Sequence, residues 1–389
     1  MRTVQRPAVT ASLAAAVLLL AAGCSSGEDK TPPGRTGSTS ATGAPSASSG
    51  SPSPKGPPAK GSVKVVSTLT EGLKSPWGVA ALPDGDLLVA SRDEGTISRV
   101  DVESGKKTVI GSVPGVAPGG EGGLMGLALS PSFASDHQVY AYFTTESDNR
   151  IARVLYDEKK PAGQQLGAPD TVLRGIPKGV RHNGGRIAFG PDKMLYAGTG
   201  ETGDTGLAQD KKSLGGKILR MTPDGQPVHG NPEADSVVYS YGHRNVQGLA
   251  WDADKRLWAS EFGQDTWDEL NLIEPGKNYG WPDAEGKAGK PGFVDPVAQW
   301  KTADASPSGI AYAEGSIWMA SLKGERLWRI PLAGAEPSAA PQSFLIGKYG
   351  RLRTVLSAGG NKVWLVTSET DTRGTPEPGD DKILQLEVK

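Results

Sequence analysis

Short runs of hydrophobic residues, partly alternating with polar ones, recur along the chain from Gly61 onward, and turn residues separate them. Runs of this length, rich in β-branched and aromatic residues and bounded by Gly, Pro and Asp, are typical of β-strands joined by hairpins. Turns such as PDG, PDK, DAD and AEG hold residues that tolerate the positive φ of tight hairpins. The pattern therefore predicts an all-β fold.

A unit of three such runs recurs six times. Each copy opens with an apolar strand after a small residue, and the copies begin at Trp77, Gly123, Gly184, Val246, Pro307 and Arg353. Their spacing of roughly 45–60 residues is the length expected for propeller blades. Radial repetition also protects most sheet edges. We therefore predict a six-bladed β-propeller over residues 62–389, with Val63–Leu69 completing the last blade.

Two long irregular segments interrupt the repeat. One is residues 202–216 inside the third copy, and the other is residues 281–306 between the fourth and fifth copies. Long insertions in a compact repeat fold lie on the surface and often line a binding site.

The N-terminal residues have the pattern of a secretory signal. Arg2 and Arg6 precede an apolar run, Ala8 to Ala22, that is too short to span a bilayer comfortably. The run ends at LAAGC, which resembles a bacterial lipoprotein signal. That resemblance implies a signal peptide over residues 1–23, cleavage before Cys24, and an extracytoplasmic protein anchored to the cell membrane by a lipid on Cys24. Ordinary secretion is the alternative.

Residues 24–61 are mainly Ser, Gly, Pro, Thr and Ala. Such a segment buries too little apolar surface to offset its ordering entropy, so we expect a flexible tether. Cys24 is the only cysteine, which excludes a disulfide or thiolate metal cluster in the folded part. The net charge of -1, from 42 Lys+Arg and 43 Asp+Glu, gives no reason to expect nucleic acid as a partner.

The chain holds four histidines, and they fall into two groups. His137 and His229 lie in polar loops, where we expect solvent exposure. His182 and His243 lie in Gly- and Asn-rich turns directly before apolar strands, and in a propeller such turns open near the central axis. Histidine is well suited to accept a proton near neutral pH. Glu201, after the strand that pairs with the His182 strand, could orient its imidazole; two unrelated polar loop residues are the alternative.

Oxygen-rich and basic residues supply two further candidate sites. The segment Glu261 to Pro282 concentrates carboxylates and turn carbonyls, which suit calcium, although a solvated acidic turn is the alternative. Cations from separate blades would form an anion site if they converge on the axis, because guanidinium forks match carboxylates. These cations are Arg244, Lys323, Arg351 and Arg353, and unrelated surface charges are the alternative.

Together the motifs resemble the soluble quinoprotein glucose/sorbosone dehydrogenases, especially the aldose sugar dehydrogenases. The resemblance covers Thr70 to Val388. It is carried, in order, by SPWGVAALPDG, GEGGLMGLALSPSF, RHNGGRIAFGPD, YGHRNVQGLAW, EFGQDTWDELNLIEPGKNYGWP, SLKGERL and GRLRTV.

The resemblance implies an enzyme that binds pyrroloquinoline quinone (PQQ) and calcium on one face of the propeller. It implies oxidation of aldose sugars at the anomeric carbon to lactones, by hydride transfer to the quinone. By motif, His182 is the general base, Glu201 is its acidic partner and Arg244 lies near the quinone carbonyls. The chain has no CxxCH haem motif, so electrons would pass to an external acceptor.

The remaining implied ligands follow the same motifs. Glu121 falls where many members have a glutamine beside the cofactor, and Asp304 falls at the cofactor edge. The implied cofactor ligands are Glu121, Arg244, Asn245, Lys323, Arg351 and Arg353. The implied calcium positions are the carbonyls of Gly263 and Gln264, and a further position at Glu269 and Tyr279.

Two other functions are open on the sequence alone. One is a cofactor-free propeller that binds carbohydrate or protein, against which the retention of His182 and the basic positions speaks. The other is a calcium-dependent lactonase on a similar fold, in which the cluster of Lys323, Arg351 and Arg353 has no obvious role.

Overall fold

The computed structural model describes residues 56–389. The predicted signal peptide, Cys24 and most of the predicted tether lie outside the described residues. The last tether residues contact the folded part: the Arg329 guanidinium donates a hydrogen bond to the Pro58 carbonyl (2.8 Å), and the Gly61 amide donates one to the Gln342 side chain (2.8 Å).

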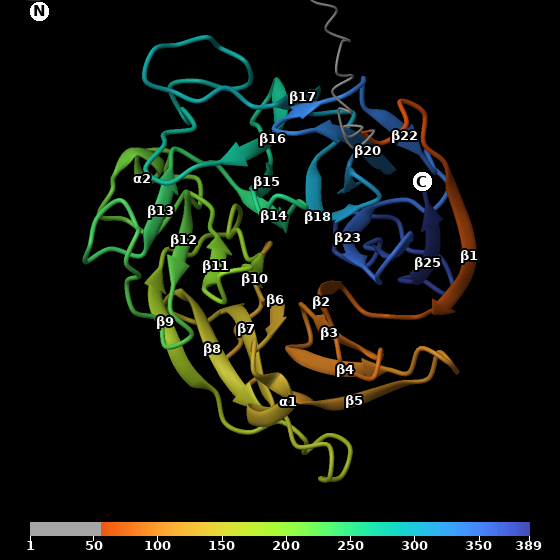
Figure 1. Cartoon of the computed structure of the whole chain (residues 1–389). Coiled ribbons are helices and arrows are strands. Elements are labelled where there is room, and N and C mark those ends of the chain that lie inside the picture. The colour runs from red at the N-terminus through yellow and green to blue at the C-terminus, as the bar shows by residue number, and fades with distance from the viewer. Residues whose placement is uncertain (1–55) are drawn as a thin grey trace, which may run out of the picture. The chain divides into compact units, whose positions relative to one another are not determined.

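Six antiparallel sheets surround a central axis, as Figure 1 shows. Blade 1 comprises β2 (Pro76–Ala81), β3 (Leu87–Ser91), β4 (Thr96–Val100) and β5 (Lys107–Ser112). Blade 2 comprises β6 (Leu124–Leu129), β7 (Gln138–Thr144), β8 (Asn149–Leu155) and β9 (Asp170–Ile176). Blade 3 comprises β10 (Ile187–Phe189), β11 (Leu195–Gly198), β12 (Lys217–Met221) and β13 (Val238–Tyr241).

Blade 4 comprises β14 (Val246–Trp251), β15 (Leu257–Glu261), β16 (Trp267–Ile273) and β17 (Ala298–Lys301). Blade 5 comprises β18 (Pro307–Ala313), β19 (Ser316–Ser321), β20 (Arg326–Ala333) and β21 (Glu336–Pro337), with β22 (Gln342–Phe344) also paired to β20. Blade 6 comprises β23 (Leu352–Ser357), β24 (Lys362–Thr367), β25 (Ile383–Val388) and β1 (Val63–Thr70).

The two ends of the propeller domain meet in blade 6. Strand β1 pairs with β25, with Val63 opposite Val388, so the N-terminal strand forms the outer edge of the last blade. This confirms the predicted closure. Backbone hydrogen bonds within blade 6 thus join the two ends of the domain, and such closure leaves only short edges exposed.

The six copies in the sequence are the six blades, and the first strand of each copy is the innermost strand. The predicted three strands per copy are too few, because each blade also has an outer strand. Outer strands such as β9 are largely exposed and carry little hydrophobic signal. Strand β17 lies inside the segment 281–306 that the sequence treats as irregular, because its four residues, AQWK, are too few to give a recognisable alternation.

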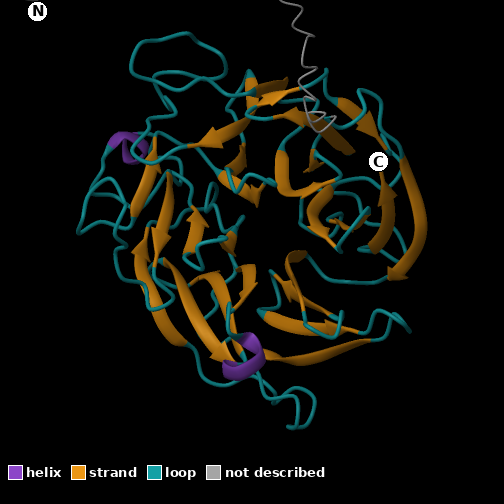
Figure 2. Ribbon diagram, in the orientation of Figure 1, coloured by secondary structure: helices purple, strands orange, loops and turns teal. Residues whose placement is uncertain are grey.

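The core lies between neighbouring blades. Leu88 of blade 1, for example, packs in one buried cluster with Leu127 and Val139 of blade 2. Burial of each such side chain stabilises the fold by ~1.5–3 kcal/mol. Among residues 56–389, helix is confined to two short turns, α1 (Phe133–Asp136) and α2 (Gly206–Gln209), the latter within the first insertion (Figure 2).

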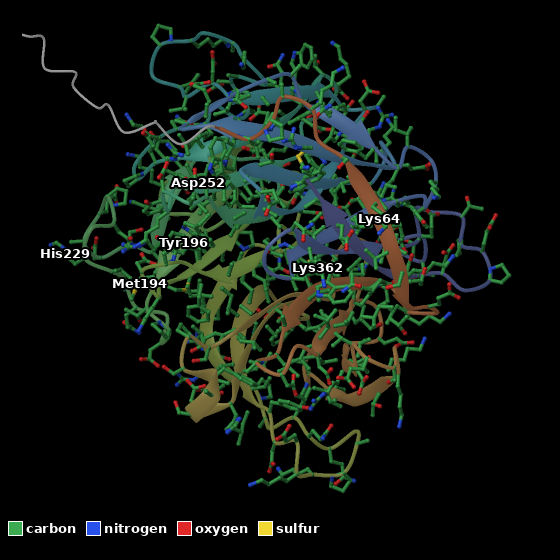
Figure 3. The ribbon with its side chains drawn as sticks, turned by 45° about the vertical axis from the view of Figure 1, so that its right-hand side comes forward. Lys64, Met194, Tyr196, His229, Asp252 and Lys362 are labelled. Atoms are coloured by element: carbon green, nitrogen blue, oxygen red, sulfur yellow. The ribbon has the colours of Figure 1, made fainter. Side chains whose placement is uncertain are left out.

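Within residues 56–389, the structure contains no helix with the length and apolarity needed to cross a membrane. His137 and His229 are exposed as predicted. Figure 3 shows His229 projecting from the edge of the molecule.

Candidate active site

Two kinds of loop build the candidate site. One kind leads into the innermost strand of a blade, and the other follows its second strand. Both kinds supply walls of one cavity of about 450 Å³. The predicted site residues that line it are Glu121, His182, Arg244, Asn245, Gly263, Gln264, Lys323, Arg351 and Arg353. The structure therefore brings together residues that lie up to 232 positions apart in the chain.

His182 lines the cavity and forms a close pair with Glu201, which lies behind it. The His182 Nδ1 lies 2.6 Å from the Glu201 Oε1, and the side chains are 10% and 1% exposed. Glu201 is held in turn by the Gly203 amide (2.5 Å). A Cβ on Gly200 would lie 1.9 Å from the His182 carbonyl oxygen, so only glycine lets these two backbone segments approach this closely. With Nδ1 paired to Glu201, Nε2 is the ring nitrogen left to face a ligand.

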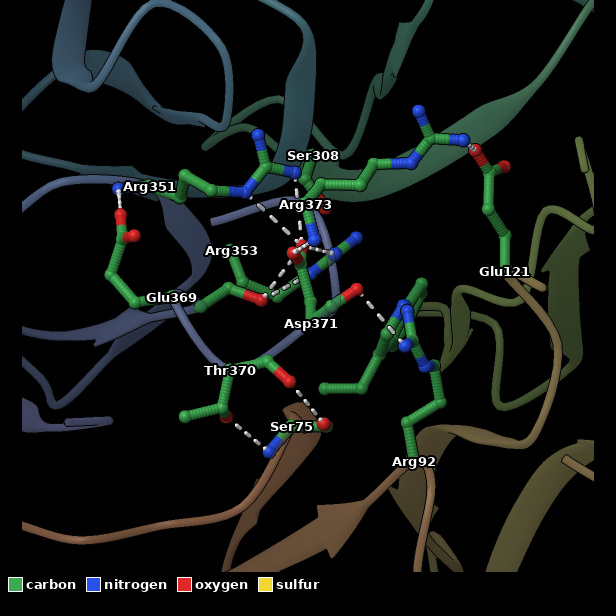
Figure 4. Close-up of polar contacts among 12 residues, drawn as sticks. Ser75, Arg92, Glu121, Ser308, Arg351, Arg353, Glu369, Thr370, Asp371 and Arg373 are labelled. Atoms are coloured by element: carbon green, nitrogen blue, oxygen red, sulfur yellow. Dashed lines mark hydrogen bonds and ion pairs between the residues drawn. The ribbon is translucent and has the colours of Figure 1, made fainter. Parts of the chain in front are cut away.

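The backbone of His182 is held in an uncommon conformation. Its φ is 54°, a region that costs a non-glycine residue ~1–2 kcal/mol. The His182 amide donates a hydrogen bond to the Glu121 carboxylate (2.9 Å), whose other oxygen lies 2.6 Å from the Arg373 guanidinium. Figure 4 shows this ion pair between blade 2 and the loop after β24. Glu121 therefore positions the histidine as well as lining the cavity.

Two arginines of blade 6 share one carboxylate on the opposite wall (Figure 4). The Asp371 Oδ2 lies 2.9 Å from Arg351 and 2.8 Å from Arg353. Although burial opposes it, the two guanidinium groups lower the pKa of Asp371. Burial in turn lowers the pKa of Arg353 to about 10, so it stays charged at neutral pH. One carboxylate cannot neutralise two guanidinium groups, and a net positive charge remains.

The cavity as a whole is cationic. Seven arginine or lysine side chains line it against three carboxylates. Among these cations, Arg244 gives the clearest indication of a bound ligand, because its buried Nε has no hydrogen-bond partner in the described structure. Burial lowers the pKa of this guanidinium, which stacks over the Trp281 ring at 5.4 Å. A buried donor without a partner, in a cavity with excess positive charge, fits a bound polyanion.

The remaining predicted ligands complete this wall. Asn245 stabilises the turn that carries His182, because its side-chain oxygen accepts a hydrogen bond from the Gly184 amide (2.9 Å). Lys323 is exposed at the rim and forms no ion pair within residues 56–389. Asp304 does not line the cavity, but its neighbours Thr302 and Ser306 do.

His243, the other histidine before an innermost strand, has a structural role. It is fully buried, with Nδ1 2.9 Å from Glu261 and Nε2 2.8 Å from Ser240. Its ring stacks on Tyr279 at 4.7 Å. Because both ring nitrogens are occupied, His243 has no free position for a substrate proton.

Carboxylates bind the backbone amides of the predicted calcium loop. The Gly263 amide donates to Asp268 (2.9 Å), and the Gln264 amide donates to Glu285 (2.8 Å). The carbonyls of Gly263 and Gln264 accept no hydrogen bond from the described part of the chain. Burial raises the pKa of Asp268, which lines the cavity, to about 6.

Glu269 and Tyr279 border a separate void of about 10 Å³, together with Glu261 and Glu285. That volume is about the space one water or ion needs. Burial and the neighbouring Glu261 raise the pKa of Glu269 well above its usual range. The Tyr279 hydroxyl is already bonded to the Leu272 carbonyl (2.6 Å). Within residues 56–389, no cluster of three or more His, Cys, Asp or Glu side chains has a metal-binding arrangement.

The sequence missed several residues of the cavity wall, above all Arg92, Gln247, Asp371 and Arg373. A signal for two of them was present. Arg92 follows β3 and Asp371 follows β24, the second strands of their blades, just as Glu201 follows β11. Since these loops open at the same end of every blade, polar residues there are candidates in each repeat.

Three comparisons place the chain among known proteins. Residues 73–375 match the family model described as glucose/sorbosone dehydrogenase. The structure is similar to the PQQ-bound form of aldose sugar dehydrogenase from Streptomyces coelicolor, at 75% identity and a TM-score of 0.85, over 86% of this chain and 100% of that one.

Two curated relatives agree. Aldose sugar dehydrogenase YliI of Escherichia coli is 30% identical over 64% of this chain and 70% of its own length. Quinoprotein glucose dehydrogenase B of Acinetobacter calcoaceticus is 29% identical over 64% of this chain and 59% of its own length. The propeller, the His182–Glu201 pair in a cationic cavity and these similarities lead to one conclusion: the chain belongs to the glucose/sorbosone dehydrogenase family.

Proposed function

We propose that the chain oxidises aldose sugars at the anomeric carbon to lactones, with PQQ as the electron acceptor in the site. The observation that carries the proposal is the His182–Glu201 pair on the wall of a cavity with seven cationic side chains. The 75% identity to a PQQ-bound aldose sugar dehydrogenase supports it.

The side chains of the cavity have separable tasks. Lys323, Arg351 and Arg353 would hold the three carboxylates of PQQ, and Arg244 would donate its unpaired Nε to the bound group. When bound, PQQ supplies an o-quinone able to accept a hydride from the sugar C1. His182 Nε2 takes the proton of the anomeric hydroxyl, so the sugar loses one hydride and one proton and becomes the lactone. Glu201 stabilises the imidazolium through Nδ1.

Calcium belongs to the proposal as well. Within residues 56–389 the carbonyls of Gly263 and Gln264 accept no hydrogen bond, and Glu269 lies beside a void of ion size. Hard cations prefer such oxygen ligands. Chelation should lower the melting temperature and the PQQ affinity, and added calcium should restore both. Unchanged values after verified removal of calcium would count against both positions.

The main test uses the purified domain with PQQ, calcium and a panel of aldoses, read by dye reduction. We expect PQQ-dependent reduction that disappears in His182→Ala, with lactone as the product. Absence of PQQ binding at micromolar concentration would refute the proposal. Hydrolysis of lactones without PQQ would instead support the lactonase.

We further propose that the enzyme is extracytoplasmic, tethered by a lipid on Cys24, and passes electrons to an external acceptor. The support is the LAAGC pattern and the Ser/Pro/Gly composition of residues 24–61. Cys24→Ser should move the protein from the detergent phase to the aqueous phase on partition. Equal partition of both forms would contradict the anchor.

A further inference from the structure

Beneath the candidate active site lies a second buried guanidinium, Arg186, which the proposed function does not use. It immediately precedes β10 and is 8% exposed. Its Nε donates to the Gln247 carbonyl (2.8 Å), and its Nη2 donates to the Thr354 hydroxyl (3.2 Å). The guanidinium also stacks over the Trp77 ring at 4.4 Å. One side chain of blade 3 thus contacts blades 4, 6 and 1.

Blade 5 reaches the same point. A Cβ on Gly309 of β18 would lie 3.1 Å from the Arg186 Nη2, so the glycine leaves room for the guanidinium. Five of the six blades therefore meet around this side chain, at the central axis. Trp77 and Gln247, which Arg186 contacts, are themselves part of the cavity wall. Arg186 thus lies one residue layer below the floor of the cavity.

The charge of Arg186 is not neutralised locally. Within residues 56–389 Arg186 forms no ion pair with a carboxylate, and the charged group that acts on it is another cation, Arg353. Both guanidinium groups stack on Trp77, and Arg353 also donates to the Gln247 side chain (3.0 Å). Burial and Arg353 lower the pKa of Arg186 to about 9, so it remains charged at neutral pH.

An unpaired buried charge destabilises a folded protein unless something compensates it. The cavity lined by Trp77, Gln247 and Arg353 borders residues that Arg186 contacts, and it has room for a compensating anion. We propose that Arg186 is an electrostatic positioning residue: from beneath the site it adds an unpaired positive charge that strengthens binding of the anionic cofactor. The inference rests on the proposed PQQ site.

The charge, rather than the shape, of Arg186 is the feature to test. Arg186→Met keeps an unbranched side chain of similar length without the charge, whereas Arg186→Lys keeps the charge without the guanidinium fork. Arg329→Met is the matched control. Arg329 is also fully buried and has no carboxylate partner within the described residues, but it lies on β20, bonded to Pro58 and Gln342, away from the cavity.

The experiment measures the dissociation constant of PQQ by calorimetry, and the melting temperature of the PQQ-free protein, for wild type and the three variants. We expect Arg186→Met to weaken PQQ binding at least tenfold, Arg186→Lys to stay within about threefold of wild type, and Arg329→Met to leave affinity unchanged. The PQQ-free Arg186→Met protein should melt no lower than Arg329→Met.

Each contrary result has a distinct meaning. If wild type fails to bind PQQ, the proposed function fails and this inference fails with it. If wild type binds PQQ and Arg186→Met binds equally tightly, the inference alone is wrong. If Arg186→Met and Arg186→Lys lose affinity equally, the role of Arg186 is packing and the electrostatic inference is overturned.

Discussion

Replacement of Glu201 by glutamine tests the central pair of the site. The change removes the negative charge beside the His182 Nδ1, 2.6 Å away, and keeps the size of a side chain that is only 1% exposed. In the proposed mechanism, the imidazolium that forms when His182 takes the substrate proton then lacks its counter-charge. We expect slower turnover with little effect on PQQ binding, because Glu201 lies behind the histidine and does not line the cavity.

The magnitude follows from the geometry. Charges about 4 Å apart interact by ~4 kcal/mol at an effective dielectric constant of ~20. Substitution of charged hydrogen-bond partners typically costs ~1.5–3 kcal/mol. A loss of ~2–4 kcal/mol from the transition state corresponds to a fall in kcat of roughly 30- to 1000-fold. KM should change less, because Glu201 contacts His182 and does not line the cavity.

The assay is a double-mutant cycle with His182→Ala, read by dye reduction under saturating PQQ. If Glu201 acts through the histidine, Glu201→Gln should change the residual rate of His182→Ala by less than about threefold. An equal loss of kcat in both backgrounds would refute the reasoning. Asp252→Asn is the control: this carboxylate is buried and binds Arg256 and Trp258 at the far end of β14, so it should lower the melting temperature without changing kcat.

Three further predictions concern charges around the site. Asp371→Asn leaves Arg351 and Arg353 without a carboxylate and should cost ~3–5 kcal/mol in urea unfolding at neutral pH. Because those arginines lower the pKa of Asp371, its contribution is present above the ordinary value of 3.8, so the gap to wild type should narrow in acid; a constant gap would contradict this. Lys217→Met removes an ammonium group that donates hydrogen bonds to the carbonyls of Leu207, Ala208 and Gly215. The rate of amide hydrogen exchange in residues 202–216 should therefore rise about tenfold, with the exchange rate of the other blades as the reference. Lys323→Met should weaken PQQ binding about tenfold without altering the melting temperature, and a matching fall in melting temperature would indicate a structural role instead.

Much of the fold followed from the repeat. Six copies of a three-strand unit are sufficient to predict six blades, and Val63–Leu69 was correctly assigned to the last one. The outer strands were not predicted, because largely exposed strands such as β9 lack a strong alternation of hydrophobic and polar residues. Strand β17 was not predicted because it has only four residues and lies within a long irregular segment.

For the candidate site, the sequence could name some residues and not others. His182, Arg244 and Arg351 stand in recognisable motifs before innermost strands, so the resemblance could name them. Asp371 and Arg373 follow a second strand in a loop with no motif, and only the closed ring brings them opposite Glu121. Likewise, the motifs placed His182 and His243 in equal positions. The tertiary structure separated them by leaving one ring nitrogen of His182 free and occupying both of His243.

The sequence by itself determined the number of blades, the residue types at the blade ends and the presence of a histidine, a carboxylate and several cations in family order. Those properties are local, because each depends on a strand, a turn and a short motif. Only the tertiary structure decided which charges neutralise each other and which stay unpaired. The unpaired Nε of Arg244 and the isolated charge of Arg186 arise from contacts among blades distant in the chain, and no local pattern records the distance between such groups.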